Sequence, residues 1–183
     1  MFKALFKKDQ SHEAARALYA AAVEQARAAP LYADLGAPDT VEGRFEMVAL
    51  HVYLIMRRLR GDAAAKKVSQ CLFDVMFQNM DDSLRELGVG DLQVGKKIRK
   101  LAENFYGRIG AYEDALKPGA EEGALARALS RNIFERETAP TASAFADYVR
   151  GADASLSAQP AARITSGVVM FPTFGALAQE AGQ

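Results

Sequence analysis

The sequence is poor in the residues that most often build chemical sites. Its 183 residues include one cysteine, two histidines and no tryptophan. A single cysteine, Cys71, excludes an internal disulfide and suits a reducing compartment, and its spacing from Val68 and Val75 predicts a place in the core. His12 and His51 have neither cysteine nor clustered carboxylates at ligand spacing. We therefore expect no metal and no cofactor.

Long apolar runs and an excess of one charge are also missing. No apolar run reaches the roughly 18 residues of a membrane span, and 23 basic residues balance 23 acidic ones. The opening MFKALFKK has neither the features of a secretory signal nor the composition of a mitochondrial leader. Its apolar residues alternate with lysines, as in a short interfacial anchor or a frayed terminus. We expect a soluble, cytoplasmic protein of bacterial type.

What the sequence does have is helical periodicity. Half of its residues are hydrophobic, and their spacing predicts an all-α, single bundle-like domain of about six helices with an irregular C-terminal tail. Ser11, Asp39 and Asp91 are the expected N-caps of three helices, and Gly88 is the expected end of another.

The helical pattern also suggests how the chain is organised. We divide it into a basic segment with the first helix (1–38), a helical core (39–159) and the tail (160–183).

Two segments carry more apolar surface than one face of a bundle requires. FEMVALHVYLIMRRL (45–59) is apolar nearly all round, which is typical of a central helix or of one that also faces a partner. CLFDVMFQNM (71–80) adds Met76 and Met80, whose flexible side chains suit varied apolar partners as well as core packing. His51 is expected to hydrogen-bond within the core, with partner contact as the alternative.

One turn between predicted helices resembles a phosphate-binding loop. Gly90, Gly95 and Lys96 match G-x-x-x-x-G-K, but Lys97 stands where serine or threonine would hold Mg²⁺. The preceding residues form an amphipathic helix rather than a strand, and Asp91 would repel phosphate. We interpret this stretch as a connection between helices and expect no nucleotide.

Two glycines lie inside a predicted helix, ENFYGRIGAYEDAL. Gly107 and Gly110 each destabilise a helix by about 1 kcal/mol relative to alanine, and with Ala111 they form a patch without large side chains. Two interpretations are open: a tight crossing with another helix, or a groove that receives a partner helix. In the second case the tail segment ARITSGVVMFPTFGAL (162–177) is a candidate strap over the groove, filled by Phe171 and Phe174.

Positive charge gathers in the middle of the chain. Between Arg57 and Arg108 there are eleven lysines and arginines against seven acidic residues. This excess is typical of a solvated helix surface, or of a face toward anionic lipid or ribosomal RNA. The candidate basic face consists of Arg57, Arg58, Lys66, Lys67, Lys96, Lys97, Arg99 and Lys100.

The segments MVALHVYLIMRRL and LFDVMFQNMDDSLRELGVGDLQVGKKIRKLAENFYGRIGAYEDAL together resemble the ubiquinol–cytochrome c chaperone family, over about residues 40 to 150. The likeness rests on the order and spacing of short elements. These are Leu50-His51-x-x-Leu54, Arg58-Leu59, Asp81-Asp82-Ser83-Leu84-Arg85-Glu86, Gly88-x-Gly90-Asp91 with the lysines after it, and Phe105-Tyr106-Gly107-Arg108.

The resemblance implies a non-enzymatic assembly factor for respiratory complex III. Its client would be cytochrome b or an assembly intermediate of it, met peripherally at the inner membrane, with a ribosome and a small partner protein as further contacts. An apolar client calls for an exposed apolar groove with a polar rim. The residues assigned to client binding are Phe105, Tyr106, Gly107, Gly110, Tyr112, Met76, Met80, His51 and Tyr53.

Two other functions are compatible with the sequence. A helical scaffold would oligomerise through the glycine face. A small enzyme would use the Asp81-Asp82 pair, but it would need a third polar group that the sequence does not place beside them. Surface charge is the simpler interpretation of this pair, and we expect no catalytic residue.

Overall fold

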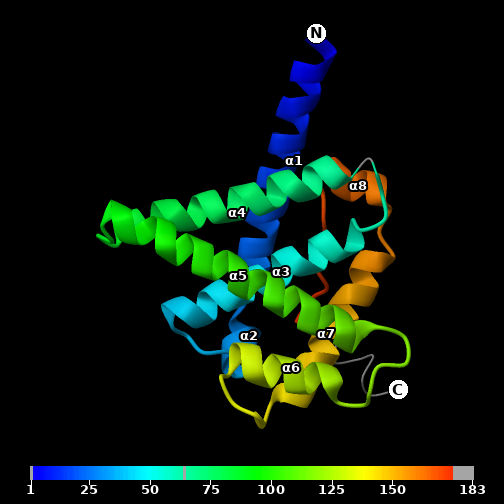
Figure 1. Cartoon of the computed structure of the whole chain (residues 1–183). Coiled ribbons are helices and arrows are strands. Elements are labelled where there is room, and N and C mark those ends of the chain that lie inside the picture. Colours follow the sequence, from blue (N-terminus) through cyan, green and yellow to red (C-terminus); the bar gives the residue numbers. More distant parts are fainter. Residues whose placement is uncertain (1, 64, 175–183) are drawn as a thin grey trace.

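All regular structure in the described residues is helical (Figure 1). The computed structural model describes residues 2–63 and 65–174. Within them, the longer helices are α1 (Phe2–Ala26), α3 (Val41–Arg58), α4 (Lys66–Glu86), α5 (Asp91–Leu116), α6 (Ala124–Ile133) and α7 (Ala142–Ser157). Two helices of five residues are α2 (Ala29–Ala33) and α8 (Ala161–Thr165). The prediction of an all-α protein is confirmed.

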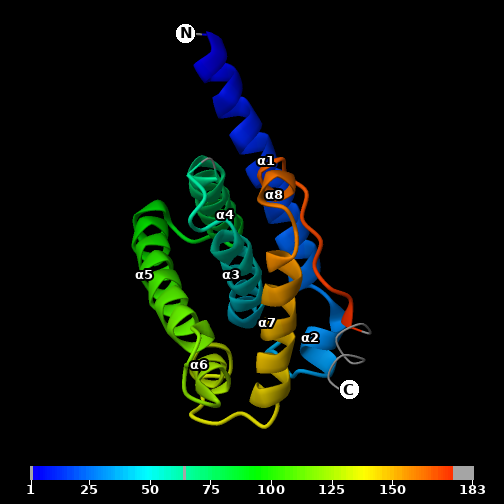
Figure 2. The same ribbon diagram turned by 90° about the vertical axis from the view of Figure 1, so that its right-hand side faces the viewer.

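Helix α3 is the centre of the molecule. Residues 49–55 are buried without interruption, so two successive turns have no solvent-facing side. Helices α1, α4, α6 and α7 all pack against α3, and Figure 2 shows it between α5 on one side and α7 and α1 on the other. Of the two interpretations of its all-round apolar surface, the central helix is therefore the one that the fold adopts.

Several predicted helix ends are wrong by a few residues. Helix α1 continues through Ser11, since the residues before it include neither glycine nor proline. Helix α3 is capped by Thr40, whose backbone is extended and whose hydroxyl accepts a hydrogen bond from the Gly43 amide at 3.0 Å. Asp39 instead pairs with Arg44, its Oδ1 lying 2.6 Å from Nε.

The glycine-rich stretch is a turn between α4 and α5. Gly88 adopts a φ of +79° and ends α4, as predicted. The expectation that Asp91 caps α5 is wrong, because Gly90 takes the extended backbone of the cap and Asp91 is already the first helical residue. Gly95 and Lys96 then lie inside α5, so the residues that match the phosphate motif do not form one loop.

Helix α1 joins the core through one side only. It packs against α4 and α3 through a row of small and medium apolar residues. Figure 1 shows its N-terminal part rising beyond the rest of the molecule. From residue 10 onward, the buried residues of α1 are Ala14, Ala15, Leu18, Ala22 and Ala26.

The segment after α8 lies on the side of the molecule away from α5. Residues 166–174 follow α1 and α7 (Figure 2), with the Phe174 ring stacked on Tyr148. This position differs from the expectation that Phe171 and Phe174 fill a groove beside Gly107, because α5 and the tail lie on opposite sides of α3. Residues 175–183, which belong to the predicted tail, lie outside the described residues.

Candidate functional site

Two glycines in the second half of α5 have no packing role in the described structure. Gly107 and Gly110 are exposed, and apart from the backbone of α5 itself no described atom lies within 4 Å of where a Cβ would stand on either residue. A tight helix crossing, one of the two interpretations of this pair, is therefore not what the fold contains. The glycines leave a strip of α5 backbone open to an incoming molecule.

An exposed aromatic residue lies beside this strip. Tyr106 is 59% exposed and its ring lies 5.5 Å from that of Phe73 on α4. Phe73 in turn contacts Phe77 and Phe105, with ring centroids 4.5 and 5.9 Å away. Because Phe105 is buried, this aromatic cluster reaches from the core to the surface and holds the ring of Tyr106 in place.

The cluster forms one wall of a groove. A hollow of about 460 Å³ lies where the end of α3, the start of α4 and the second half of α5 meet. Its apolar lining includes Met56, Phe73, Tyr106 and Ile109, and charged or polar groups surround these residues. The groove thus combines apolar walls with a polar rim, as a site for an apolar partner requires.

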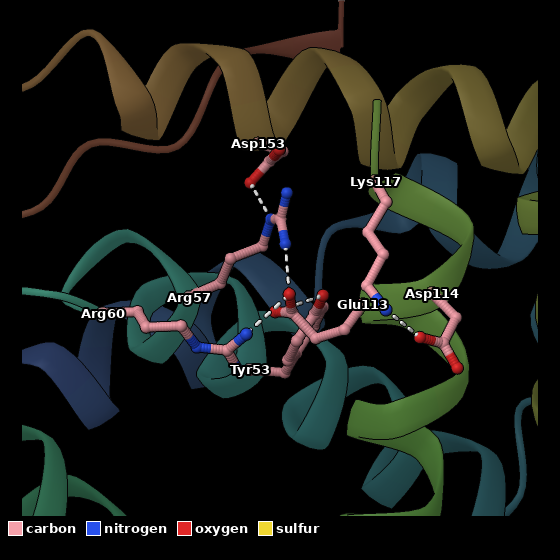
Figure 3. A network of polar contacts seen from close by, with 7 residues as sticks. All are labelled: Tyr53, Arg57, Arg60, Glu113, Asp114, Lys117 and Asp153. Carbon is pink, nitrogen blue, oxygen red and sulfur yellow. Dashed lines mark hydrogen bonds and ion pairs between the residues drawn. The ribbon is translucent and has the colours of Figure 1, made fainter. Parts of the chain in front are cut away.

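One carboxylate ties the wall of this groove together (Figure 3). Glu113 on α5 accepts hydrogen bonds from the Tyr53 hydroxyl at 3.0 Å and from Nη1 of Arg57 at 2.6 Å. Nη1 of Arg60 lies 2.6 Å from the same carboxylate. Arg57 also donates through Nε to Asp153 on α7 at 2.9 Å. The network therefore joins α3, α5 and α7 and fixes the end of α5 that borders the groove.

A second ion pair joins α3 and α5 in the interior. Nε of Arg108 lies 2.6 Å from Oε2 of Glu46, and both side chains are largely buried. Burial raises the pKa of Glu46 to about 7, although Arg108 opposes that rise. Arg108 follows Gly107 directly, so the helix that presents the glycines outward is anchored inward by the next residue.

The structure divides the predicted client-binding residues into two groups. Three of them are at the surface: Tyr106, Gly107 and Gly110. Six are buried, with exposed fractions of 9% or less: His51, Tyr53, Met76, Met80, Phe105 and Tyr112. Of the buried group, Tyr53 lines the groove and Phe105 packs against Phe73 in its wall. His51 instead contacts Tyr148 and Phe171 on the other side of α3. The groove itself also contains Met56, Phe73 and Ile109, which were not assigned to client binding.

The predicted basic residues do not form one surface. Arg57 is engaged with Glu113 and Asp153, and Arg58 donates to main-chain oxygens of Leu156 and Gln159. The six exposed residues form two groups on different helices of the α4–α5 hairpin, roughly 20 Å apart along it. Lys66 and Lys67 are at the start of α4, and the other group consists of Lys96, Lys97, Arg99 and Lys100.

His51 makes its hydrogen bonds inside the core, as expected. Its Nδ1 lies 2.6 Å from the Met47 carbonyl oxygen, so this nitrogen carries the proton. Its Nε2 then accepts from the Tyr148 hydroxyl, also at 2.6 Å. Burial lowers the pKa of His51 to about 4, and the side chain is neutral at physiological pH.

The residues considered for chemistry have structural surroundings. Cys71 is buried in the core. Asp81 pairs with Arg85, and Asp82 accepts a hydrogen bond from Gln78, both within α4. Within residues 2–63 and 65–174, no three or more His, Cys, Asp or Glu side chains are grouped so that they could hold a metal ion.

Sequence patterns missed the residues that build the two polar networks. Glu113 follows Tyr106 by seven residues and Gly110 by three, so helical spacing alone places it on the same face of α5. This spacing could have identified Glu113 as a site residue from the sequence alone. Asp153, in contrast, meets Arg57 across 96 residues, and no local pattern indicates such a partner.

Comparison with known proteins adds sequence and fold relatives. A family profile described as "Ubiquinol-cytochrome C chaperone" matches residues 33–174. The "Ubiquinol-cytochrome-c reductase complex assembly factor 1" of Xenopus laevis is 23% identical over 125 residues, which cover 68% of this chain and 62% of that protein. The human protein of this description is 24% identical and is covered over 41% of its length. The chain thus spans less than two thirds of these relatives.

One solved structure has nearly the same extent. The "Crystal structure of the Cbp3 homolog from Brucella abortus" is 37% identical in sequence and superposes with a TM-score of 0.82. The match covers 94% of this chain and 97% of that one. The helical arrangement described above is therefore shared with an experimentally determined protein.

Proposed function

The chain belongs to the ubiquinol–cytochrome c chaperone family, and on this basis we propose that it is a non-enzymatic assembly factor that binds cytochrome b, or an early assembly intermediate of it. Related proteins are assembly factors of the ubiquinol–cytochrome c reductase complex, complex III. Binding and release require no covalent step, because a higher affinity for the unassembled client than for the assembled one is sufficient.

One observation carries the proposal: the open glycine pair beside an exposed aromatic residue. Gly107 and Gly110 are unfavourable in a helix and have no described packing partner. Gly107 and Gly110 directly follow Tyr106 and Ile109, which line the groove together with Phe73. Small residues allow a second helix to approach closely, which is how many membrane helices associate. A helix of an apolar client is thus a suitable occupant of the groove.

The tip of the α4–α5 hairpin supports contact with an anionic membrane surface. Leu87 and Leu92 are 67% and 90% exposed there, and Lys96, Lys97 and Lys100 follow within the next three turns of α5. Exposed leucines next to lysines suit the boundary between head groups and acyl chains. No helix in the described part of the chain is long and apolar enough to cross a bilayer, and the proposed contact is peripheral.

The test is site-specific cross-linking in a respiring bacterium. A photoreactive residue at Tyr106 is expected to capture cytochrome b, whereas one at Arg131, exposed on α6, is not. Gly107→Leu should abolish the capture at Tyr106 by filling the open strip. Gly95→Leu is the matched control, since Gly95 is equally open on the same helix but has no groove-lining residue next to it in the chain. Equal capture in both variants would contradict the groove.

A scaffold that self-associates through the same face is the second candidate, because the exposed Tyr106 and the glycine strip would also fit another copy of the chain. Light scattering over a dilution series separates the two functions. A mass that doubles with concentration in the parent, but not in Gly107→Leu, would favour the scaffold. A constant monomer mass would favour the chaperone.

A further inference from the structure

The tail is an extended segment that no described strand accompanies. Between residues 168 and 171 its side chains alternate: Val168 and Met170 are 45% and 57% exposed, while Val169 and Phe171 are partly buried against the core. This alternation is that of a β-strand lying on a surface. Its main-chain N–H and C=O groups form hydrogen bonds with the side chains of Gln25 on α1 and of Gln159, which follows α7.

Gln159 pairs with the tail as a neighbouring strand would. Its Nε2 donates to the Met170 carbonyl oxygen at 2.7 Å, and its Oε1 accepts from the Met170 amide at 2.9 Å. Gln159 is itself held by Arg58, which donates through Nη2 to the Gln159 carbonyl oxygen at 2.6 Å. On Met170 both bonds use only main-chain atoms, so the Gln159 side chain recognises an extended backbone rather than a particular side chain.

Gln25 on α1 makes a second main-chain contact, to the Pro172 carbonyl oxygen at 3.4 Å. Its amide is oriented from beneath, because it also donates to the Tyr148 hydroxyl at 3.1 Å. Tyr148 donates in turn to His51. His51 and Tyr148 are buried, and Gln25 is partly buried at the edge of the core. Their evident effect is to fix a hydrogen-bond donor at the surface where the tail lies.

Two aromatic side chains complete the contact. The Phe171 ring meets His51 edge-on, with centroids 5.2 Å apart. The Phe174 ring lies parallel to that of Tyr148, with centroids 4.9 Å apart. Gln25, Gln159 and Tyr148 are uncharged side chains, and His51 is neutral. An apolar segment can therefore contact these four residues without desolvating a charge. Among the described residues, the one charged side chain seen against the tail is Arg163, which lies 3.0 Å from the Met170 sulfur and is exposed.

We propose that this face of α1, α3 and α7 is a second client-binding site, which accepts an extended apolar segment with aromatic residues three positions apart and which the tail occupies until such a segment displaces it. The identification of the occupant with a client rests on the proposed function. The site differs in shape from the α5 groove: one face receives a helix and the other an extended strand, as a client with helices and connecting segments would require.

Hydrogen exchange of the unmodified protein tests whether the tail can leave. The amide of Met170 is expected to exchange at least about 100-fold faster than amides in the middle of α3 and α7, since a displaceable segment opens without global unfolding. Exchange of Met170 as slow as that of α3 would overturn the proposal, and this measurement needs no variant.

Binding of a labelled peptide with the sequence of residues 166–174 tests the site itself. The full-length Phe171→Ala/Phe174→Ala variant should bind this peptide about tenfold or more tightly than the parent, because its own tail competes less. Adding Gln159→Ala should remove the binding, whereas adding Gln93→Ala, an exposed glutamine on α5, should not. Equal affinity of parent and tail variant, or binding that survives Gln159→Ala, would overturn the site.

Two outcomes separate this inference from the proposed function. If the peptide binds as expected but Gln25→Ala/Gln159→Ala leaves cytochrome b capture at Tyr106 unchanged, the second site has no role in client binding while the proposed function stands. If neither the parent nor any variant captures cytochrome b, but Gln159→Ala still removes peptide binding, the tail site exists and the proposed client is wrong.

Discussion

Two buried ionisable side chains on α3 have pKa values that shift in opposite directions. Burial raises the pKa of Glu46 from 4.5 to about 7; Arg108 lowers it, and Glu135 raises it further. Burial lowers the pKa of His51 from 6.5 to about 4. Each shift is worth about 3 kcal/mol, so each residue has a large but separate effect on how stability depends on pH.

The two effects should cancel over part of the acidic range. As pH rises from 4.5 to 7, the unfolded state loses the Glu46 proton that the folded state keeps, so this contribution to stability is lost. As pH falls from 6.5 to 4, His51 becomes protonated in the unfolded state but stays neutral in the folded state. The contribution of neutral His51 to stability is therefore lost over this range. Between 4.5 and 6.5 we expect an almost flat profile.

Glu46→Gln should remove the effect of Glu46 that balances that of His51 between pH 4.5 and 6.5. The free energy of unfolding of this variant is expected to fall by about 1.4 kcal/mol per pH unit below pH 6.5, because the His51 contribution is then unopposed. Urea unfolding at several pH values between 5 and 7 measures the slope, which is independent of any constant loss from the unpaired Arg108. Parallel profiles for parent and variant would show that Glu46 is ionised throughout this range.

Replacing the exposed glycines of α5 by alanine should raise the stability of the protein and weaken its binding to the client. Gly107→Ala and Gly110→Ala should each raise the free energy of unfolding by about 1 kcal/mol, which shifts the melting temperature by about 2–4 °C. Gly43→Ala is the contrasting case, since a Cβ there would lie 2.0 Å from the Pro38 carbonyl oxygen and should destabilise α3. A loss of stability in the α5 variants would mean that the glycines have a structural role.

At the scale of elements, the Glu113 network predicts how firmly α5 is attached. Glu113→Gln should lower the free energy of unfolding by about 2 kcal/mol, because Arg57 on α3 and Arg60 just after it lose a carboxylate that is largely buried. Asp114→Asn is the control: the next residue pairs with Lys117 in solvent (Figure 3) and should show no measurable change. If Glu113→Gln and Asp114→Asn changed the thermal unfolding equally, the Glu113 network would not be what attaches α5.

The hairpin tip makes a prediction about membranes. Leu87→Ser/Leu92→Ser should reduce flotation with vesicles of anionic lipid about tenfold or more, since each inserted leucine contributes about 1.5–3 kcal/mol. Val41→Ser removes an equally exposed apolar side chain from the start of α3 and should have no effect. Binding that depends only on the lysines and falls with salt would indicate a purely electrostatic contact.

Elements were easier to predict than the contacts between them. The six longer helices could be predicted because apolar spacing is a local property of α1, α3, α4, α5, α6 and α7. Their ends were less certain, since Thr40 and Asp39 are both good caps and only the backbone at Thr40 decides between them. The groove and the tail site depend on pairs such as Arg58 and Gln159, which are 101 residues apart, and no local signal connects them.

At the scale of the whole molecule, we expect α1 to unfold together with the other helices, because its buried residues belong to the common core. Leu18→Ala should lower the free energy of unfolding by about 2–4 kcal/mol, because Leu18 is fully buried among residues of the common core. Arg16→Ala, on the exposed side of the same helix, should have little effect. Denaturation should remain a single transition for both variants; separate melting of α1 would show that it is an appended segment.

The central position of α3 has a consequence for how the chain must be made. During synthesis α3 is completed before α4, α5, α6 and α7, which cover much of it in the folded protein. The apolar surface of α3 therefore leaves the ribosome before these helices have been made. The His51–Tyr148 hydrogen bond spans 97 residues, and at about 5–20 residues per second the delay is roughly 5–20 s. During this interval α1 is the one long helix already made that can pack against α3, and the interior closes only when α7 emerges.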